Sequence, residues 1–214
     1  MSTHQIPDIV VGRLPIYLRA LRHLAENGKA TTSSHELARQ LGISSAQIRK
    51  DLSHFGEFGK QGTGYNVNYL IGQLRHILNL EAEWCVALVG VGFLGQALAS
   101  YPGFTDRGFR ICRVFDKDLE RVGKKVNGIT VQHISELTET VQREHIQVAI
   151  LALPAWAAQD MADVLVKAGI KAILTYAPIN LIVPPDVYVR YSDPVVQLQQ
   201  MAYYLNREAA DSAG

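Results

Sequence analysis

The feature that most constrains this chain is a glycine-rich turn between an apolar run and a helix-forming run. Residues 86–89 are apolar and partly β-branched, which predicts a buried strand. Gly90, Gly92 and Gly95 follow that run at G-x-G-x-x-G spacing. The first glycine permits a tight turn, the second lets the backbone approach a pyrophosphate, and the third lets the helix pack closely on the strand. The stretch therefore predicts a βα unit that binds a dinucleotide, with its diphosphate at the helix N-terminus.

An acidic residue stands at the distance that such a unit needs. Residues 109–115 predict a second strand, and Asp116 ends it 21 residues after Gly95. A carboxylate there accepts hydrogen bonds from the adenosine ribose hydroxyls and repels a 2′-phosphate. We predict NAD(H) as the cofactor, although Lys117 leaves NADP(H) open, and an N-capping aspartate without a ligand is the alternative. The residues expected to bind the cofactor here are Gly90, Val91, Gly92, Phe93, Leu94, Gly95, Asp116 and Lys117.

A second pattern predicts two short helices with a tight joint. Ser33 precedes Glu36, and Ser44 precedes Gln47, each at the spacing of a capping box that starts a helix. Gly42 lies between the two helices, where a left-handed residue is needed. Two short helices joined in this way indicate a helix-turn-helix.

The second of these helices has a polar face that suits DNA. Ile48, Leu52 and Phe55 share one face and are expected to pack inward. The opposite face and its flanks carry small, amide, hydroxyl and cationic side chains, which can contact base edges and phosphates. A solvated amphipathic helix is the alternative interpretation. The residues expected to contact DNA from this helix are Ser45, Gln47, Arg49, Lys50, Ser53 and His54.

A glycine-tipped hairpin is predicted directly after that helix. Three glycines surround Lys60 and Thr63, and Tyr65 and Val67 then alternate. A hairpin straight after a recognition helix is the wing of a winged-helix domain, and its tip can reach phosphate or a minor groove. The residues expected to contact DNA from the wing are Lys60, Gly62, Gly64 and Tyr65.

The remaining runs alternate between strand and helix patterns, which predicts an α/β fold with a doubly wound parallel sheet. Expected helices span residues 7–27, 69–80 and 155–168, and expected strands span 148–153, 172–175 and 187–191. Residues 120–143 are expected to form a short excursion of the chain away from the sheet, followed by a helix. Pro15 predicts a kink or a fresh start in the first helix. The predicted organisation is a winged-helix DNA-binding domain at 1–80, a Rossmann NAD(H)-binding domain at 81–192, a C-terminal dimerisation helix at 193–207 and a frayed tail at 208–214.

Charge, apolar runs and cysteines bear on the partner and the compartment of the protein. The net charge of +1 hides an asymmetry: residues 1–80 hold 9 Lys/Arg against 5 Asp/Glu, and residues 81–214 hold 12 against 15. A basic small part beside an acidic part suggests that the first part meets a polyanion. No run approaches the roughly 18 apolar residues of a membrane span. Cys85 and Cys112 stand apart in predicted strands, which favours separate thiols in a reducing cytoplasm over a disulfide or a metal site.

These motifs together resemble the Rex family of redox-sensing transcriptional repressors. The resemblance covers residues 6–206 and is strongest at 47–65 and 90–95. Three shorter stretches add to it, which are Tyr101-Pro-Gly-Phe104, Phe115-Asp-Lys-Asp118 and Tyr176-Ala-Pro178. It implies a homodimer that binds an inverted-repeat operator as double-stranded DNA and releases it when NADH binds.

The resemblance also implies further site residues. Tyr101, Pro154, Ala177 and Pro178 would complete the cofactor site. A swapped C-terminal helix would insert between the partner's two domains, and a switch would join Arg19, Tyr101 and Asp193. Two other classes stay open, which are an NAD-dependent dehydrogenase and a CoA- or nucleotide-binding module without DNA binding. The dehydrogenase would need a proton-handling residue near the nicotinamide, and His133 and His145 are expected at the surface, so we predict no catalytic residues and no metal site.

Overall fold

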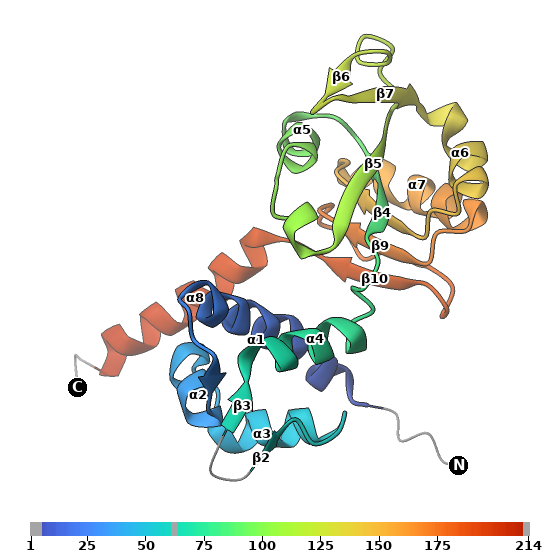
Figure 1. The fold of residues 1–214 in the computed structure, drawn as a ribbon. Helices are drawn as coiled ribbons and strands as arrows, with labels where there is room; N and C mark the ends of the chain where they lie inside the picture. Colours follow the sequence, from blue (N-terminus) through green and yellow to red (C-terminus); the bar gives the residue numbers. More distant parts are fainter. Residues whose placement is uncertain (1–5, 61–63, 212–214) are drawn as a thin grey trace. The chain divides into compact units, whose positions relative to one another are not determined.

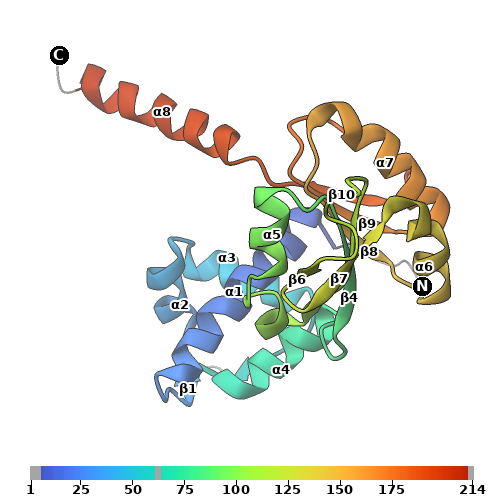
Figure 2. The same cartoon turned by 90° about the horizontal axis from the view of Figure 1, so that it is seen from above.

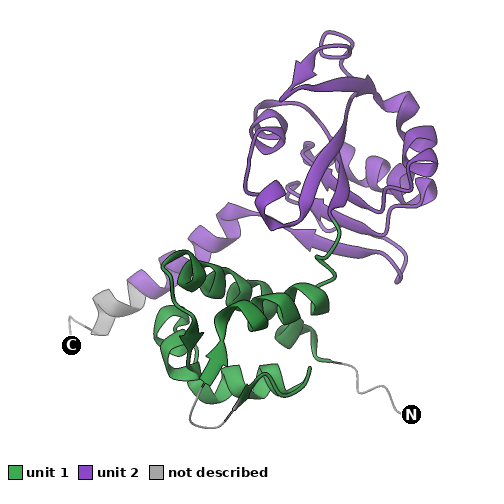
Figure 3. Cartoon of the chain, in the orientation of Figure 1, with its two compact units in different colours: residues 1–82 green, residues 83–214 purple. Residues whose placement is uncertain are grey.

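The chain forms two compact units. In this computed structural model the described residues are 6–60 and 64–211. Unit 1 is Met1–Ala82 and unit 2 is Glu83–Gly214 (Figure 3). Within residues 6–60 and 64–211, every helix is too short or too polar to span a lipid bilayer.

Unit 1 is a winged helix-turn-helix domain (Figure 1). β3 lies between β1 and β2 and pairs antiparallel with both. The helices pack around fully buried leucine and isoleucine side chains, among them Leu14, Leu37, Ile48 and Leu74. The elements are α1 (Asp8–Glu26), β1 (Thr31–Thr32), α2 (Ser34–Leu41), α3 (Ser45–Ser53), β2 (Gly59–Lys60), β3 (Gly64–Asn66) and α4 (Val67–Ile77).

Side-chain caps set the ends of the helix-turn-helix. The Ser33 hydroxyl accepts a hydrogen bond from the Glu36 N–H at 3.1 Å, and the Ser44 hydroxyl accepts one from the Gln47 N–H at 3.2 Å. Gly42 ends α2 with a φ of 66°. The side chains of Glu36 and Gln47 turn to other partners, so the return half of each predicted capping box is not formed. Each helix start is therefore capped from one side only.

Three details of unit 1 differ from the prediction. α1 continues through Pro15, so a fresh helix start there is wrong. The buried Leu14 and Tyr17 on either side anchor the helix in the core, which offsets the one backbone hydrogen bond that proline removes. The pairing of β1 with the wing was not predicted. α4 begins at Val67 instead of residue 69, because the Asn66 side chain accepts a hydrogen bond from the Tyr69 N–H at 2.9 Å and caps the helix there.

Unit 2 is built on a seven-stranded sheet with helices on both faces (Figures 1 and 2). The strand order is β10-β9-β8-β4-β5-β7-β6, and every pair is parallel except β6 with β7. The elements are β4 (Trp84–Val89), α5 (Phe93–Ala99), β5 (Phe109–Asp116), β6 (Lys125–Val126), β7 (Ile129–His133), α6 (Leu137–Arg143), β8 (Val148–Leu151), α7 (Ala155–Ala168), β9 (Ala172–Thr175), β10 (Tyr188–Tyr191) and α8 (Pro194–Asp211).

The order of the parallel strands is the Rossmann order. Counted from β4 along the chain, the six parallel strands stand in space as 3-2-1-4-5-6 from β7 to β10. The order reverses between β4 and β8, which is where such sheets bind dinucleotides. This topology confirms the predicted α/β fold.

Apolar side chains cover both faces of the sheet. On one face, Phe115 and Leu151 belong to a cluster with Leu165 of α7 and Leu137 of α6. On the other face, Leu88 belongs to a cluster with residues of α5 and of the strands. Alternate residues of β4 thus point to opposite faces, as a strand with helices on both sides requires.

Two elements of unit 2 extend beyond the prediction. The excursion at 120–143 contains β6 and β7, and β7 adds a parallel strand beside β5. α8 continues to Asp211, four residues past its predicted end, so the first part of the predicted frayed tail is helical. The rest of that tail, residues 212–214, lies outside the described part of the chain.

Cys85 and Cys112 form a disulfide between β4 and β5, so the prediction of two separate thiols is wrong. The β4–β5 register shifts between Val86 and Ala87, and Cys112 is the extra residue of β5 at that shift. The two Cα atoms lie 5.6 Å apart, within the range that a disulfide spans. A register shift between strands has no signature in the spacing of two cysteines, and the cysteines no longer support a reducing compartment.

Candidate functional site

The loop between β4 and α5 is shaped by its glycines. Gly90 has a φ of 96°, and a Cβ on Gly95 would overlap the carbonyl oxygen of Gly90. Side chains at these two positions are therefore excluded by the backbone itself. Among the described residues, only the Arg121 guanidinium comes within 4 Å of a Cβ built on Gly92, at 3.8 Å. Two glycines are thus required by the fold, and the third leaves the loop open to a ligand.

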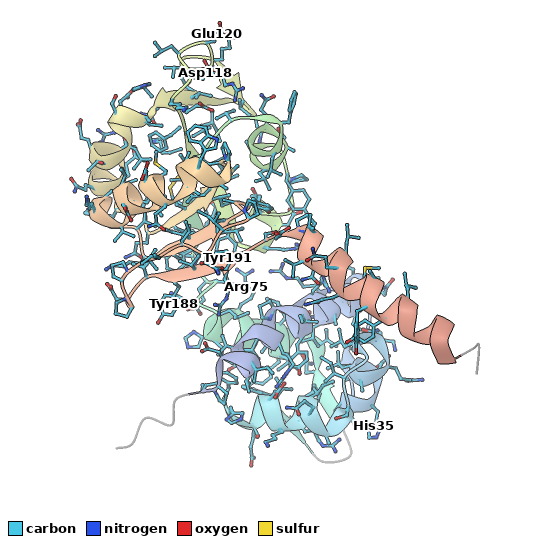
Figure 4. All side chains as sticks on the ribbon, turned by 180° about the vertical axis from the view of Figure 1, so that it is seen from behind. His35, Arg75, Asp118, Glu120, Tyr188 and Tyr191 are labelled. Carbon is cyan, nitrogen blue, oxygen red and sulfur yellow. A yellow bond between two sulfur atoms is a disulfide. The ribbon has the colours of Figure 1, made fainter. Side chains whose placement is uncertain are left out.

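Asp116 ends β5 beside this loop. Its Oδ2 accepts a hydrogen bond from the Val91 N–H at 2.7 Å, and its Oδ1 accepts one from the Asp118 N–H at 2.9 Å. The Arg121 guanidinium lies 3.5 Å from Asp116 and 3.1 Å from Asp118. Figure 4 shows Asp118 and Glu120 together in the loop after β5. An ionised carboxylate offers about four acceptor positions, and Val91, Asp118 and Arg121 occupy three of them. Asp116 can therefore fix the loop and still accept a hydrogen bond from a ribose hydroxyl.

Two residues of this region were missed by sequence reasoning. Arg121 contacts the predicted ribose acceptor, and Trp156 lies at the start of α7 with 71% of its surface exposed. The Lys117 ammonium lies 4.4 Å from the centre of the Trp156 ring, a cation–π contact. Their positions just after strand ends were the available signal, because ligands of such sheets bind at the carboxyl ends of the strands.

The other predicted cofactor residues follow strands of the same sheet. β4, β5, β8 and β9 run parallel, so the segments after them begin at one edge. Pro154 follows β8, and Ala177 and Pro178 follow β9. Tyr101 follows α5, is half-exposed, and packs edge-to-face on Phe104 with ring centroids 5.5 Å apart. The topology thus brings the loop and the residues after β8 and β9 to one edge, and Tyr101 lies beyond α5.

The outward face of α3 is available in unit 1. Lys50, Ser53 and His54 are exposed, and the Ser53 hydroxyl donates a hydrogen bond to the Lys50 carbonyl at 2.7 Å. Arg49 is exposed on the flank and donates a hydrogen bond to the Ser34 hydroxyl of α2 at 3.0 Å. The predicted DNA-facing side of the helix therefore carries cationic groups that reach solvent. Ser45, in its first turn, is half-buried.

Beneath that face lies a buried polar network that the sequence did not predict. Asp51 is completely buried, and its carboxylate accepts hydrogen bonds from Arg13 at 2.5 and 2.7 Å, Tyr17 at 2.6 Å and Gln47 at 2.7 Å. Burial opposes the charged form, but the hydrogen bonds from Arg13, Tyr17 and Gln47 outweigh it and hold the pKa of Asp51 below its usual range. Asp51 thus ties the recognition helix to α1, and Gln47 faces both the carboxylate and the surface.

The wing is held by small residues. A Cβ on Gly59 would come 2.9 Å from the Tyr65 ring, and Gly64 has a φ of 76° with its missing Cβ directed at the Thr32 carbonyl. Tyr65 is half-buried, and burial raises the pKa of its hydroxyl although Arg49 opposes the shift. The side chain of Lys60 and the whole of Gly62 lie outside the described residues.

The three predicted switch residues belong to different units. Arg19 is exposed on α1 of unit 1, whereas Tyr101 and Asp193 lie in unit 2. The Asp193 carboxylate accepts a hydrogen bond from the Val195 N–H at 2.9 Å at the start of α8. α8 begins at Pro194, a position where proline is well tolerated. The apolar side chains of α8 between Val195 and Leu205 are exposed.

Known proteins similar to this chain match both units. The family model "Putative DNA-binding protein N-terminus" matches residues 5–53, and the model "CoA binding domain" matches residues 81–179. A redox-sensing transcriptional repressor Rex of Chloroflexus aurantiacus is 52% identical over 202 residues, which are 94% of this chain and 95% of that protein. The chain belongs to the Rex family of redox-sensing transcriptional repressors.

Solved structures agree with this Rex-family assignment. The structure of RSP in complex with β-NAD+ and operator DNA matches with a TM-score of 0.90 and 38% identity, over 97% of this chain and 95% of that one. The structure of RSP with β-NADH matches with a TM-score of 0.89 and 36% identity, over 98% and 99% of the two chains. The likeness includes the DNA-binding unit, so the CoA-binding model describes only the Rossmann part of a Rex-family chain.

Proposed function

We propose that this Rex-family protein represses transcription by binding an inverted-repeat operator as a homodimer and leaves the DNA when NADH binds unit 2. The observation that carries the proposal is one chain that joins a winged helix with an exposed cationic face to a Rossmann loop beside Asp116. RSP, a Rex-family repressor of the same fold, binds β-NAD+ with operator DNA and also β-NADH. In this way the protein would sense the NADH/NAD+ ratio.

On the DNA side, α3 would enter the major groove. Lys50, Ser53 and His54 form its exposed face, with Ser45, Gln47 and Arg49 on the flanks. The wing would add Lys60, Gly62, Gly64 and Tyr65 along the backbone or the minor groove. A two-fold dimer places its recognition helices at half-sites about one helical turn or a multiple of it apart. The exposed apolar side of α8 supports such a dimer, because it needs a second copy or another surface to cover it.

On the cofactor side, the dinucleotide would lie across the edge formed by the ends of β4, β5, β8 and β9. Residues 90–95 would hold the pyrophosphate, and Asp116 would accept hydrogen bonds from the adenosine ribose. Lys117 is engaged by Trp156, which reduces its freedom to reach a 2′-phosphate and favours NAD(H) over NADP(H). Pro154, Ala177 and Pro178 would border the nicotinamide half.

A switch would couple the two events. NADH can move the protein from the DNA-binding state only by binding the other state more tightly, and a change from 1:99 to 99:1 needs about 10⁴-fold tighter binding. Tyr101 lies beyond the phosphate-binding helix and would sense the nicotinamide. Asp193, at the head of α8, would exchange an Arg19 partner for the Tyr101 hydroxyl. A buried charge is costly to leave unpaired, so the exchange would act as a two-state switch.

The protein would act as a regulator and not as an enzyme, in the cytoplasm where operator DNA lies. Hydride transfer needs a proton-handling residue beside the nicotinamide. Of the two histidines of unit 2, His133 caps a short helix after β7 by accepting a hydrogen bond from the Ser135 N–H. His145 lies just before the start of β8, away from the carboxyl ends of the strands. This supports a cofactor that is sensed and not consumed.

Two variants test the proposal from opposite ends. Asp116→Ala should weaken NADH binding and narrow the gap between NADH and NADPH, since a repulsive carboxylate is removed. Arg49→Ala with Lys50→Ala should weaken operator binding and lower the salt slope by about 1 unit for each phosphate that is no longer neutralised. Each variant serves as the control of the other, because the first should still bind operator and the second should still bind NADH. An operator affinity and salt slope unchanged by the double substitution would contradict the role of α3.

A further inference from the structure

Asp51 places a buried carboxylate directly beneath a residue of the DNA-facing helix. Arg13 and Tyr17, both on α1, donate to it and compensate its charge. Gln47 also donates to it, and this residue stands one turn before Asp51 on α3 itself. Its side chain is half-buried, between the core and the outer face. Gln47 is therefore the member of the network that links the carboxylate to the surface of the recognition helix.

The carboxylate decides which way the Gln47 amide points. A free glutamine can present either its oxygen or its NH₂ group outward, because the two ends have nearly the same shape. An ionised carboxylate only accepts hydrogen bonds, and Gln47 Nε2 lies 2.7 Å from Asp51 Oδ1. The reverse orientation would set the amide oxygen against a charged oxygen at that distance. The amide is thus held with one N–H directed at Asp51, which leaves Oε1 and the second N–H of Nε2 for another partner.

An amide held in this way distinguishes the bases. In the major groove adenine presents a donor at N6 beside an acceptor at N7, and a glutamine pairs with both. Guanine presents acceptors at O6 and N7, so the fixed Oε1 of Gln47 would face another oxygen. Gln47 is the third residue of α3, and the first residues of a recognition helix are those that contact base edges. An amide free to turn would lose this discrimination, because its NH₂ group could then face O6.

We propose that Asp51, by orienting the Gln47 amide, makes the recognition helix select adenine over guanine at one position of each operator half-site. Asp51 is a positioning residue in this scheme, and Gln47 is the residue that reads the base. The inference rests on the proposed binding of operator DNA by α3. A bidentate contact of this kind discriminates by about 5- to 150-fold between bases.

The test measures base preference as well as affinity. The full-length protein without NADH is titrated against an operator and a panel in which each half-site base pair is replaced in turn, by fluorescence anisotropy at fixed salt. Gln47→Ala should abolish the base preference at one operator position and leave the preferences at the other positions unchanged. Asp51→Asn should reduce the adenine-to-guanine ratio at that same position while the salt slope stays as in the wild type. Tyr17→Phe is the matched control, since it removes a donor to Asp51 without touching Gln47, and it should keep the wild-type preference even if the protein is less stable.

The outcomes separate this inference from the proposed function. If Asp51→Asn is too unstable to bind DNA, the double variant Arg13→Gln with Asp51→Asn removes the charge and its partner together and takes its place. A wild-type ratio at every position in the Asp51 variants, or no single position altered by Gln47→Ala, would overturn the inference while operator binding stands. Wild-type protein that binds operator no better than unrelated DNA would instead overturn the proposed function, and the inference with it.

Discussion

The two proposed binding sites of this protein are shaped by different parts of the chain, which are backbone atoms in unit 2 and side chains in unit 1. In unit 2 the loop after β4 is shaped by backbone, because Gly90 and Gly95 approach other backbone atoms more closely than any side chain allows. In unit 1 the recognition helix is held by side chains, because Asp51 binds Tyr17 and Arg13 of α1, which lie 34 and 38 positions earlier in the chain. The first kind of site depends on a short local pattern, whereas the second depends on the packing of two helices. The two kinds should therefore fail in different ways when they are altered.

Removal of a donor from the Asp51 network should have the largest effect. Arg13→Ala leaves a buried charge without its main partner, which costs about 3–5 kcal/mol of stability. The melting temperature and the operator affinity should both fall, whereas the affinity of unit 2 for NADH should change little. Arg39→Ala, at an exposed arginine of α2, is the control and should be nearly neutral. A destabilisation no larger than that of the control would mean that side-chain interactions do not hold the helix.

The same network predicts a dependence on acid. The pKa of Asp51 is held below its unfolded value of about 3.9, so its contribution to stability is fully present above that pH and is lost as the pH falls through the depressed value. In Arg13→Ala the hydrogen bonds that lower the pKa of Asp51 are reduced while burial remains. The variant should therefore lose less stability to protonation of Asp51, but because it starts from a lower stability, the acid-unfolding midpoint of unit 1 should still move to higher pH. Circular dichroism between pH 2 and pH 6 measures it, and equal midpoints would contradict the assignment.

Reduction of the disulfide should rank second and should separate stability from binding in unit 2. A disulfide that closes a loop of this size contributes about 2–4 kcal/mol. Wild-type protein should therefore melt at a lower temperature in dithiothreitol, while a variant with both Cys85 and Cys112 changed to Ser should melt at one temperature with or without the reductant. NADH affinity should remain close to that of the wild type, because the bond lies outside the glycine loop. If the wild-type melting temperature did not change on addition of the reductant, the contribution of the disulfide to stability would be contradicted.

A single methyl group in the loop should have a smaller effect on stability but a local effect on function. Gly95→Ala forces the new Cβ against the Gly90 carbonyl, so the backbone of the loop must move to accept the methyl group, at a cost of at least about 1–3 kcal/mol. NADH binding should weaken, because the loop that holds the pyrophosphate must shift, while operator binding is retained. Gly72→Ala, in α4 where a Cβ meets no atom within 4 Å, is the matched control and should bind NADH as the wild type does. Equal NADH affinities in the two variants would contradict the conclusion that backbone contacts at Gly95 shape the cofactor loop.

How much the sequence could predict follows the same division. The glycine spacing, the strand before it and Asp116 after it are local, so the Rossmann topology and the loop were predictable. The helix-turn-helix was predictable from its caps and its turn glycine. The Asp51 network was not, because Arg13 lies off the apolar stripe of α1 and its periodicity indicates a solvated face. Likewise the disulfide depends on a register shift between strands, and β7 holds only two aliphatic residues, Ile129 and Val131, where β8 and β9 hold continuous apolar runs.

One chain would thus read the nicotinamide redox state and transmit it to DNA. The most direct measurement is a titration of the protein–operator complex with NADH and, separately, with NAD+, followed by fluorescence anisotropy of the labelled DNA. NADH should raise the apparent Kd for operator, NAD+ should do so far less, and Asp116→Ala should shift the NADH response to higher concentration. An apparent Kd that stays the same at saturating NADH would contradict this coupling.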